Sequence, residues 1–519
     1  MAGDVAGHRT VTDPAGTPRT ARLVRLLPLT FLALFFFWPV AHAATFLHPG
    51  TLLDTLTRAD TLRVAWFTLW QAAASTAVTL VVGLPLTWAT SRYTFRGANL
   101  LRGLASAPFL MPAVVVATGI AAALPDRGIP AILWAHTCFN VAVVLTVVGP
   151  RWAMTDPDME DAAASLGANT FTTFTRVTWP SIRSAVVTAS SLVFAFCFSS
   201  FAVISILGGA HLRTLETEVF TQAVRLGDIP TATALALLQT VVVVTVIAFG
   251  RTRGTEPTRT NPSPRRLTSR FRRPWLPPAI AAAATTFTAA PLALVAVRSV
   301  RSGGTFTLSG WRALFDGSLE PVGIHTGAVI THSVTFAAVT AVIATALALL
   351  AARRTPTLAE RLSFAPLVIS AVTLGLGLII TFDDAPTDWR SRTWLLPVVH
   401  AVVALPLAVR TIATALRGID DDLYVMAADL GATPLRTWWS VELPLLRPAI
   451  TRAAGISAAV SLGEFGATSF LSRSGSMTVP IAIGQLMGRP GALLQQAAFA
   501  LATLIAMGTA VAITSIVSD

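Results

Sequence analysis

The chain contains one polar segment twice: Asp158-Met-Glu-Asp-Ala-Ala-Ala-Ser-Leu-Gly167 and, 264 positions later, Asp422-Leu-Tyr-Val-Met-Ala-Ala-Asp-Leu-Gly431. Without a gap, residues 158–186 and 422–450 are identical at 11 of 29 positions. Unrelated segments of ordinary composition would share roughly two or three. Each copy lies between long hydrophobic runs, so the sequence predicts a duplicated domain with the same polar loop in both halves.

The composition excludes a water-soluble globular protein. Hydrophobic residues make up 53% of the 519 residues and charged residues only 12%, whereas a soluble domain carries about a quarter charged residues. Lipid must therefore be the solvent for much of the chain. The net charge of +12 is carried by arginine alone, because the sequence contains no lysine. These arginines fall in the loops, which favours anionic lipid headgroups over nucleic acid as their partners.

Apolar stretches long enough to cross about 30 Å of hydrocarbon, roughly 20 residues each, recur along the chain. We expect an all-α polytopic membrane protein whose twelve transmembrane helices form two parallel six-helix repeats. The first stretch ends in Ala41-His-Ala43, which is also typical of a cleaved signal peptide. We favour a retained helix, since cleavage would leave the first half one span short. The predicted spans are 23–43, 64–90, 104–124, 129–150, 182–207, 231–250, 275–297, 326–352, 362–382, 393–413, 449–471 and 494–516.

The sequence divides into four parts. Residues 1–22 predict a disordered cytoplasmic tail, and residues 251–274 an Arg- and Pro-rich cytoplasmic linker, because neither has an apolar period. Residues 23–250 and 275–519 are the two predicted membrane halves. The arginine bias of the short loops predicts that both termini and both copies of the polar loop face the cytoplasm.

Each copy of the polar loop predicts a short helix, a sharp turn and a second helix. The first segment is rich in small residues and good helix formers, and it closes on Gly167 or Gly431, where a left-handed residue costs little. Pro180 and Pro444 follow about a dozen residues later, and we expect them to mark the start of the next membrane helix. Small side chains on such a loop would let another protein approach its backbone closely.

The doubled loop resembles the Glu-Ala-Ala motif of binding-protein-dependent ABC importer permeases, Glu-Ala-Ala-x-x-x-Gly followed by a hydrophobic residue, any residue, and Leu-Pro. The first copy matches with Asp in place of Glu, whereas Val425 and Met426 stand at the acid and the first alanine of the second copy. The resemblance implies that both loops are coupling helices, which contact ATPase subunits. It assigns this role to Asp161, Ala162, Ala163, Gly167 and Pro180 in the first loop and to Ala427, Ala428, Gly431 and Pro444 in the second.

Three other segments, 197–209, 214–222 and 461–466, resemble the fused two-half permeases of thiamine and ferric-iron importers. The resemblance implies a multi-pass protein of the bacterial plasma membrane that forms a substrate pathway and is not itself an enzyme. Its implied partners are two ATP-binding cassette ATPase subunits, which use the ATP, and an extracytoplasmic substrate-binding protein. No cofactor is implied for this chain, and the implied cargo is thiamine or ferric iron.

One acid, Glu464, lies within an apolar run, where an ionised side chain is costly and is often functional. At the repeat offset its counterpart is Ser200. Together with Ser199 and Ser461, these residues are candidates for the lining of a translocation path that suits a cationic cargo. The alternative, which we leave open, is an acid that packs between helices and is hydrogen-bonded to a neighbouring backbone.

A secondary transporter is the main alternative function, because twelve helices in two halves also describe that architecture. A facilitator of that class would carry Gly, Asp and basic residues between its second and third spans, which the loop 91–97 does not match. A membrane enzyme would need clustered catalytic side chains, which the sequence does not offer. Cys138 and Cys197 lie in apolar runs and predict buried thiols, not a metal site.

The purified chain is expected neither to bind nor to hydrolyse ATP. A phosphate-binding P-loop requires the pattern Gly-x-x-x-x-Gly-Lys, and the sequence has no lysine. Phosphate release by the detergent-solubilised chain checks this expectation. Hydrolysis that persists after contaminating ATPases have been removed would contradict it.

Overall fold

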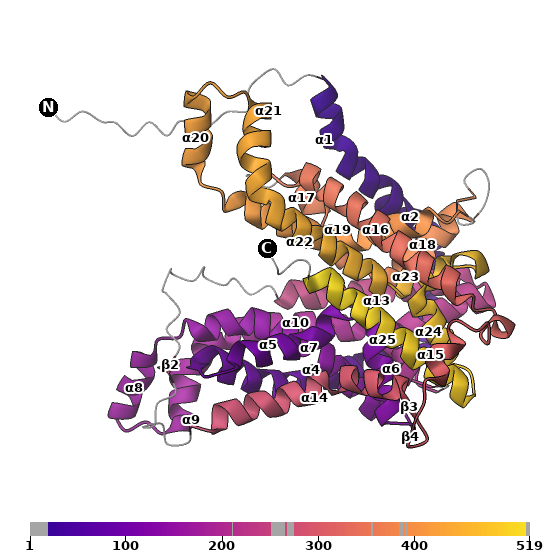
Figure 1. Ribbon diagram of the computed structural model, residues 1–519, viewed down its shortest axis with the longest axis horizontal. Helices are drawn as coiled ribbons and strands as arrows, with labels where there is room; N and C mark the ends of the chain where they lie inside the picture. Colours follow the sequence, from indigo (N-terminus) through magenta and orange to yellow (C-terminus); the bar gives the residue numbers. More distant parts are fainter. Residues whose placement is uncertain are drawn as a thin grey trace.

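The computed structural model describes residues 19–209, 211–250, 265–266, 274–353, 357–383, 388–389 and 392–514. Helices dominate this part of the chain, and they form two groups that meet at one end and diverge at the other (Figure 1). Most of the tail predicted at 1–22, and the linker predicted at 251–274 apart from residues 265–266 and 274, lie outside the described residues. The predicted all-α membrane fold is confirmed.

The elements of the first half run in the following order. They are α1 (Arg19–Leu32), η1 (Ala33–Phe37), α2 (Trp38–Ala44), α3 (Pro49–Thr57), α4 (Ala59–Arg92), β1 (Tyr93–Thr94), α5 (Ala98–Leu110), α6 (Ala113–Ala123), α7 (Ile129–Ala153), α8 (Pro157–Ser165), α9 (Thr170–Thr173), η2 (Phe174–Thr178), α10 (Trp179–Phe198), α11 (Ala202–Leu207), α12 (Leu215–Phe220), η3 (Thr221–Leu226) and α13 (Ile229–Gly250).

The second half repeats this order, after the short strand β2 (Arg265–Arg266), which pairs with β1. Its elements are α14 (Leu276–Ser299), β3 (Arg301–Ser302), β4 (Thr305–Phe306), α15 (Ser309–Ala313), η4 (Glu320–Val322), α16 (Thr326–Ala351), α17 (Leu358–Leu362), η5 (Ala365–Leu367), α18 (Ala371–Phe382), α19 (Leu395–Arg417), α20 (Asp421–Asp429), α21 (Pro434–Thr437), η6 (Trp438–Glu442), α22 (Leu443–Gly463), α23 (Gly466–Leu471), η7 (Ser474–Ser476), α24 (Val479–Met487) and α25 (Ala492–Thr514).

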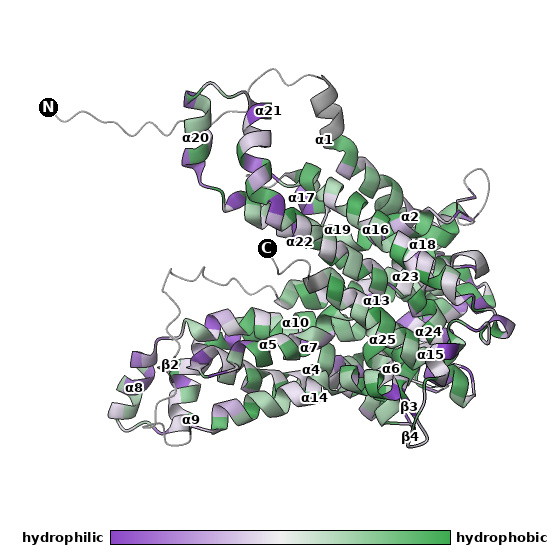
Figure 2. Cartoon of the chain, viewed as in Figure 1, coloured by the Kyte–Doolittle hydropathy of each residue, from purple (hydrophilic) through white to green (hydrophobic). Residues whose placement is uncertain are grey.

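Within the described residues, nine helices are long and apolar enough to cross a membrane, or up to eleven if each of two bent pairs counts as one span. The predicted number was twelve. The difference lies at the predicted span 449–471, because α22 carries Arg447 and Arg452 and does not reach the hydropathy of the nine. Figure 2 shows the apolar surface along the long helices, with polar residues gathered on α8 and in the loops at the opposite end.

The two predicted spans 104–124 and 362–382 are bent, not straight. Helices α5 and α6 meet at 103°, and the segment from α17 to η5 meets α18 at 102°. In the first half, Pro112 precedes α6 and disfavours a helical conformation at Met111, which is extended. In the second half, Ser370 caps α18 by accepting a hydrogen bond from the backbone N–H of Thr373 at 3.0 Å. The bends therefore occupy equivalent places in the two halves.

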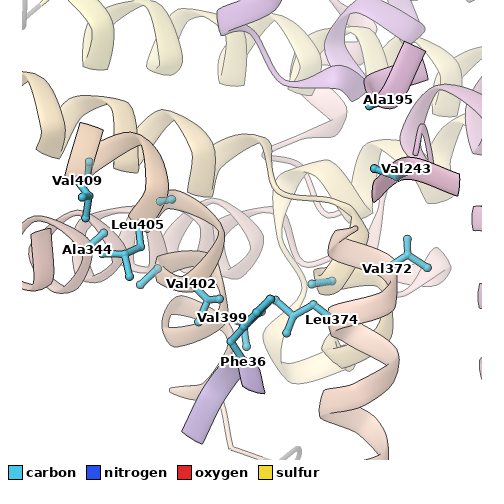
Figure 3. Packing of buried hydrophobic residues seen from close by; sticks show 14 of the residues in the cluster. Phe36, Ala195, Val243, Ala344, Val372, Leu374, Val399, Val402, Leu405 and Val409 are labelled. Carbon is cyan, nitrogen blue, oxygen red and sulfur yellow. The ribbon is translucent and has the colours of Figure 1, made fainter. Parts of the chain in front are cut away.

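The first helix of each half packs on the other half. Helix α14, which begins the second half, contacts α4, α5 and α6, whereas α1 and α2 contact α16 and α18. Figure 3 shows Phe36 of η1 among Val399 and Val402 of α19 and Leu374 of α18, in one buried cluster. Each half therefore contributes its first helix to the helix bundle of the other half.

Glycine permits both exchanged contacts. A Cβ atom on Gly119 of α6 would lie 2.1 Å from the carbonyl oxygen of Pro291 in α14, and one on Gly377 of α18 would lie 2.7 Å from that of Pro39 in α2. Backbones can approach this closely only where there is no side chain, as is common between membrane helices.

Pro291 also makes possible a hydrogen bond between α14 and the first half. A proline within a helix cannot donate to the carbonyl four residues earlier, and this carbonyl belongs to Phe287. The indole Nε1 of Trp134, on α7, donates a hydrogen bond to it at 3.0 Å. The first half thus satisfies a polar group that the exchanged helix leaves open, as the bilayer interior requires.

We predict that Gly119→Ala lowers the stability of the folded protein by about 1–3 kcal/mol, the usual cost of overpacking. The new methyl group must displace backbone, not a flexible side chain. Thermal unfolding of the purified full-length chain, followed by fluorescence-detected size exclusion, measures the effect. The control is Gly103→Ala on α5, where a Cβ meets nothing within 4 Å. Equal melting temperatures for the two variants would contradict the close approach.

Candidate functional site

The doubled polar loop forms two short helices, α8 and α20, at the end where the two groups of helices diverge (Figure 1). Both begin in the same way. The side chain of Asp156 accepts a hydrogen bond from the backbone N–H of Asp158 at 2.9 Å, and Asp420 accepts one from Asp422 at 3.1 Å. Each aspartate satisfies a backbone donor that the first helical turn leaves open. The sequence repeat is therefore also a structural repeat.

Both helices end on the predicted glycines. Gly167 has a φ of +85° and Gly431 a φ of +75°, in the left-handed region that favours glycine. The backbone N–H of Ala168 bonds the carbonyl of Ala163 at 3.0 Å, and that of Ala432 bonds the carbonyl of Ala427 at 2.9 Å. This pattern reverses the chain at the helix end and satisfies its last carbonyls.

Pro180 and Pro444 are the second residues of α10 and α22, close to the predicted helix starts, but helical structure already begins upstream of each. The helix that contains Pro180 begins at Thr170 and runs unbroken to Phe198. A wider π-helical turn precedes each proline, η2 in the first half and η6 in the second. A proline in a regular helix clashes with the carbonyl four residues earlier, and π-type turns relieve such local conflicts. The helix therefore continues through the proline.

Different contacts attach α8 and α20 to their halves. The guanidinium of Arg92, at the end of α4, bonds the carboxylate of Glu160 at 2.5 Å, and its side chain is only 4% exposed. The other oxygen of Glu160 accepts a hydrogen bond from the hydroxyl of Thr178 at 2.8 Å. At the repeat positions, the hydroxyl of Tyr424 donates to the carboxylate of Glu442 at 3.1 Å. Glu160 of α8 is thus bonded to an arginine, whereas the equivalent contact of α20 is a hydrogen bond from the hydroxyl of Tyr424.

The segments that directly follow α8 and α20 carry exposed apolar side chains. Leu166 is 89% exposed and Leu430, its repeat counterpart, is 85% exposed. Phe171 and Leu435 form a second exposed pair at equivalent positions. Such apolar groups at the tip of a membrane protein suit contact with another protein. Sequence reasoning missed them, although the leucine before each glycine is identical in the two copies.

The acid and the alanines among the predicted coupling residues lie on α8 and α20. Asp161 and Ala162 are exposed and Ala163 is half-buried. In the second copy, Ala428 is exposed whereas Ala427 is buried. The two motifs therefore present different numbers of their small residues to the outside.

A cavity of about 910 Å³ lies between the two halves, lined by α11, α12 and η3 of the first and by α23 and α24 of the second. Helix α24 lies at the end of the molecule away from α8 and α20 (Figure 1). The rings of Phe201 and Phe465 meet in its wall with their centroids 5.5 Å apart. Residues at the repeat offset line the cavity together, namely Phe201 with Phe465, Ser205 with Ser469, and Arg225 with Arg489.

The four residues predicted for a translocation path do not line this cavity. Ser199 and Ser200 are half-buried at the end of α10. Ser461 is buried, with its hydroxyl 2.8 Å from Nδ1 of His400. Their place in a path stays a prediction.

Glu464 caps helix α23. Its two carboxylate oxygens accept hydrogen bonds from the backbone N–H groups of Ala467 at 2.9 Å and Thr468 at 2.8 Å, and the Thr468 hydroxyl also donates to it. Nε2 of His400 lies 3.7 Å away. These contacts match the alternative of a packing acid bonded to the neighbouring backbone.

A second buried acid escaped sequence reasoning. Glu216 on α12 is fully buried, and it accepts a hydrogen bond from the side-chain amide of Gln239 on α13. Burial raises the pKa of its carboxyl to about 8, although bonds from Gln239 and from Ser370 of the second half oppose the shift. The bonds from Gln239 and Ser370 therefore connect Glu216 to both halves. Within the described residues, no three His, Cys, Asp or Glu side chains gather as a metal site.

Comparison with known proteins gives consistent results. The family model described as "Binding-protein-dependent transport system inner membrane component" matches residues 344–519. The thiamine transport system permease protein ThiP of Brucella abortus is 25% identical over 463 residues, 82% of each chain. The probable ABC transporter permease protein y4fN of Sinorhizobium fredii is 26% identical over 476 residues, 83% of each chain. The putative 2-aminoethylphosphonate transport system permease protein PhnV of Salmonella typhimurium is 32% identical over 126 residues, 24% of this chain and 48% of PhnV.

The family match covers α20 and the second half, and the long relatives extend the similarity over most of the chain. The repeat of the loop geometry carries the same assignment to the first half. Such a permease is distinct from the ATPase of its system, and the family name implies both an ATPase and a binding protein as partners. Residues 344–519 thus match the inner-membrane components of binding-protein-dependent transport systems, and the chain is similar over most of its length to ABC transporter permeases.

Proposed function

We propose that this permease docks two ATPase subunits, one on α8 and one on α20, and passes a small solute between its two halves. The observation that carries the proposal is the pair of projecting helices with matching caps, left-handed glycines and exposed leucines. A pair of equivalent docking helices fits two copies of one ATPase better than a single partner. The inter-half cavity lies at the other end, which supports entry of the solute from a binding protein there.

Thiamine is the first cargo to test, and ferric iron the second. The ThiP similarity over 82% of this chain supports thiamine, whereas ferric iron rests on the sequence resemblance alone. The shorter similarity to PhnV shows that a permease for a different solute shares part of this sequence. Glu464 no longer supports a cationic cargo, because its carboxylate caps α23.

We predict that Gly167→Val abolishes uptake while the protein still inserts and assembles in the membrane. Left-handed backbone costs a residue with a side chain roughly 1–2 kcal/mol, and the valine would turn the end of α8 away from its docking position. Gly167→Asn is the matched control, because asparagine tolerates this conformation and a Cβ here meets nothing within 4 Å. Uptake of labelled cargo into cells and co-purification of the ATPase are the measurements.

The equivalent substitution Gly431→Val should do less harm. The ion pair of Arg92 and Glu160 fixes α8 rigidly to its half, and the second motif already departs from the pattern at Val425. Normal uptake and normal ATPase recovery in both valine variants would remove the coupling role of these helices.

Accumulation of labelled thiamine by cells with the complete transporter, with competition by unlabelled thiamine but not by ferric iron, would support thiamine as the cargo. Glu464→Gln tests the role of the acid in the same assay. Glutamine keeps one oxygen acceptor and replaces the other with an NH2 donor, so one of the two buried N–H groups loses its acceptor. An unpaired buried donor costs about 1–3 kcal/mol, so this variant should lower the amount of folded protein. Uptake per folded molecule should stay near the wild-type value. A fall in uptake per molecule, at normal protein level, would instead support a role of Glu464 in the translocation path.

A further inference from the structure

The cavity between the halves is strongly basic. Four arginines line it, Arg213, Arg225, Arg473 and Arg489, and its lining contains no aspartate, glutamate or histidine. Two of the four have carboxylate partners: Arg213 bonds Glu218 at 3.0 Å, and Arg473 bonds Asp383 at 3.2 Å. These pairs reduce the positive charge at two corners of the cavity but leave the other two arginines uncompensated.

Arg225 and Arg489 are the uncompensated pair, and they occupy the same position in the two repeats. In the described part of the chain, no carboxylate forms an ion pair with either. The guanidinium of Arg225 lies 6.0 Å from the centre of the Phe220 ring, and Arg489 donates a hydrogen bond to the carbonyl of Val322 at 2.8 Å. Neutral partners therefore position both groups without cancelling their charge.

We propose that this cavity receives an anionic group of the transported solute, a phosphate, phosphonate or carboxylate, and that Arg225 and Arg489 bind it. The inference rests on the proposed function, since the cavity is a passage only if the chain is a permease. Guanidinium groups bind such oxyanions through paired, charge-assisted hydrogen bonds. Two like charges in one concave space repel each other unless an anion lies between them, so an anion stabilises the arrangement.

The aromatic and hydroxyl groups of the same cavity fit this assignment. Phe201 and Phe465 offer apolar faces to the organic part of a solute, and the side chains of Ser205 and Ser469 lie at equivalent places in its lining. Bare thiamine or a bare ferric ion would meet only positive charge here. A cargo that carries an anionic group, or a metal ion held by an anionic chelator, complements it.

The test measures the local electrostatic potential with charged thiol reagents. In the full-length chain with Ser205→Cys, reconstituted in phosphatidylcholine nanodiscs, the new thiol reacts either with the anionic ethylsulfonate methanethiosulfonate or with the cationic trimethylammonium analogue. Ser205 is exposed in the cavity, whereas Cys138 and Cys197 are buried. Ser469→Cys is the second reporter, should the first variant fold poorly.

We expect the anionic reagent to be favoured, and this preference to fall about tenfold when Arg225→Gln and Arg489→Gln are combined, because nearby charges act on the two reagents in opposite directions. The matched control is Arg301→Gln with Arg312→Gln, which removes two exposed arginines that do not line the cavity. An equal change in the control, or none in the cavity variant, would overturn the proposal.

A second arm asks which anion enters. Methylphosphonate should slow modification of the Ser205→Cys thiol in phosphatidylcholine nanodiscs, and equal ionic strength of sodium chloride should not. Protection that requires phosphatidylglycerol and is not given by methylphosphonate would assign the cavity to a lipid headgroup and overturn the solute assignment. Lost co-purification of the binding protein in the Arg225→Gln, Arg489→Gln variant, with unchanged reagent preference, would overturn it in favour of a docking surface.

These measurements need neither ATP nor uptake. A negative result of the uptake experiment at Gly167 would contradict the proposed function but would not affect the measured reagent preference. A negative result of the reagent experiment would contradict the anion site but not the proposed coupling.

Discussion

Two close backbone contacts hold the molecule in its arrangement. Gly119 allows α14 to lie against the first half, and Gly377 allows α2 to lie against the second. Each half therefore contains a helix from the other, and neither can close its own bundle alone. The inter-half cavity exists because the exchanged helices bring α11 and α12 opposite α23 and α24 without filling the space between them.

The same exchange gives α8 a firm base. Helix α8 is attached through Arg92 to the end of α4, and α4 is one of the helices on which α14 packs. Helix α9 and the π-helical turn η2 lead from α8 directly into α10, which ends beside the cavity wall at Phe201. Continuous helix therefore runs from Thr170 to Phe198, and the turn at Gly167 joins α8 to its start. A displacement of α8 can reach the cavity through this one turn and one continuous helix, which is a physical basis for coupling.

The sequence predicts much of this structure. The repeat at 158 and 422 located both coupling helices and the glycines that end them, because capping and left-handed turns depend on neighbouring residues alone. Hydropathy located nearly all the long helices. It could not show that 104–124 and 362–382 are bent, since a bend at Pro112 or Ser370 does not change mean hydropathy.

Other features depend on contacts between distant residues. The hydropathy of the sequence does not show that α2 and α14 pack on the opposite halves. The role of Gly119 is visible only in the structure, where Pro291 lies against it. The repeat offset pairs positions 200 and 464, but the residues that meet across the cavity are their neighbours, Phe201 and Phe465. The cap that Glu464 forms on α23 depends on a turn that the apolar pattern around it hides.

The exchange of helices also has a consequence for biosynthesis. Helix α2 ends at Ala44, but α18, the helix it packs on, is complete only when the ribosome has reached Phe382. At a synthesis rate of about 5–20 residues per second, this interval lasts on the order of 20–70 s. During that time α1 and α2 reside in the bilayer without their native neighbours, and lipid must shield the surfaces that α16 and α18 later cover. The order of translation thus makes the span formed by α1, η1 and α2 one of the last to reach its final contacts.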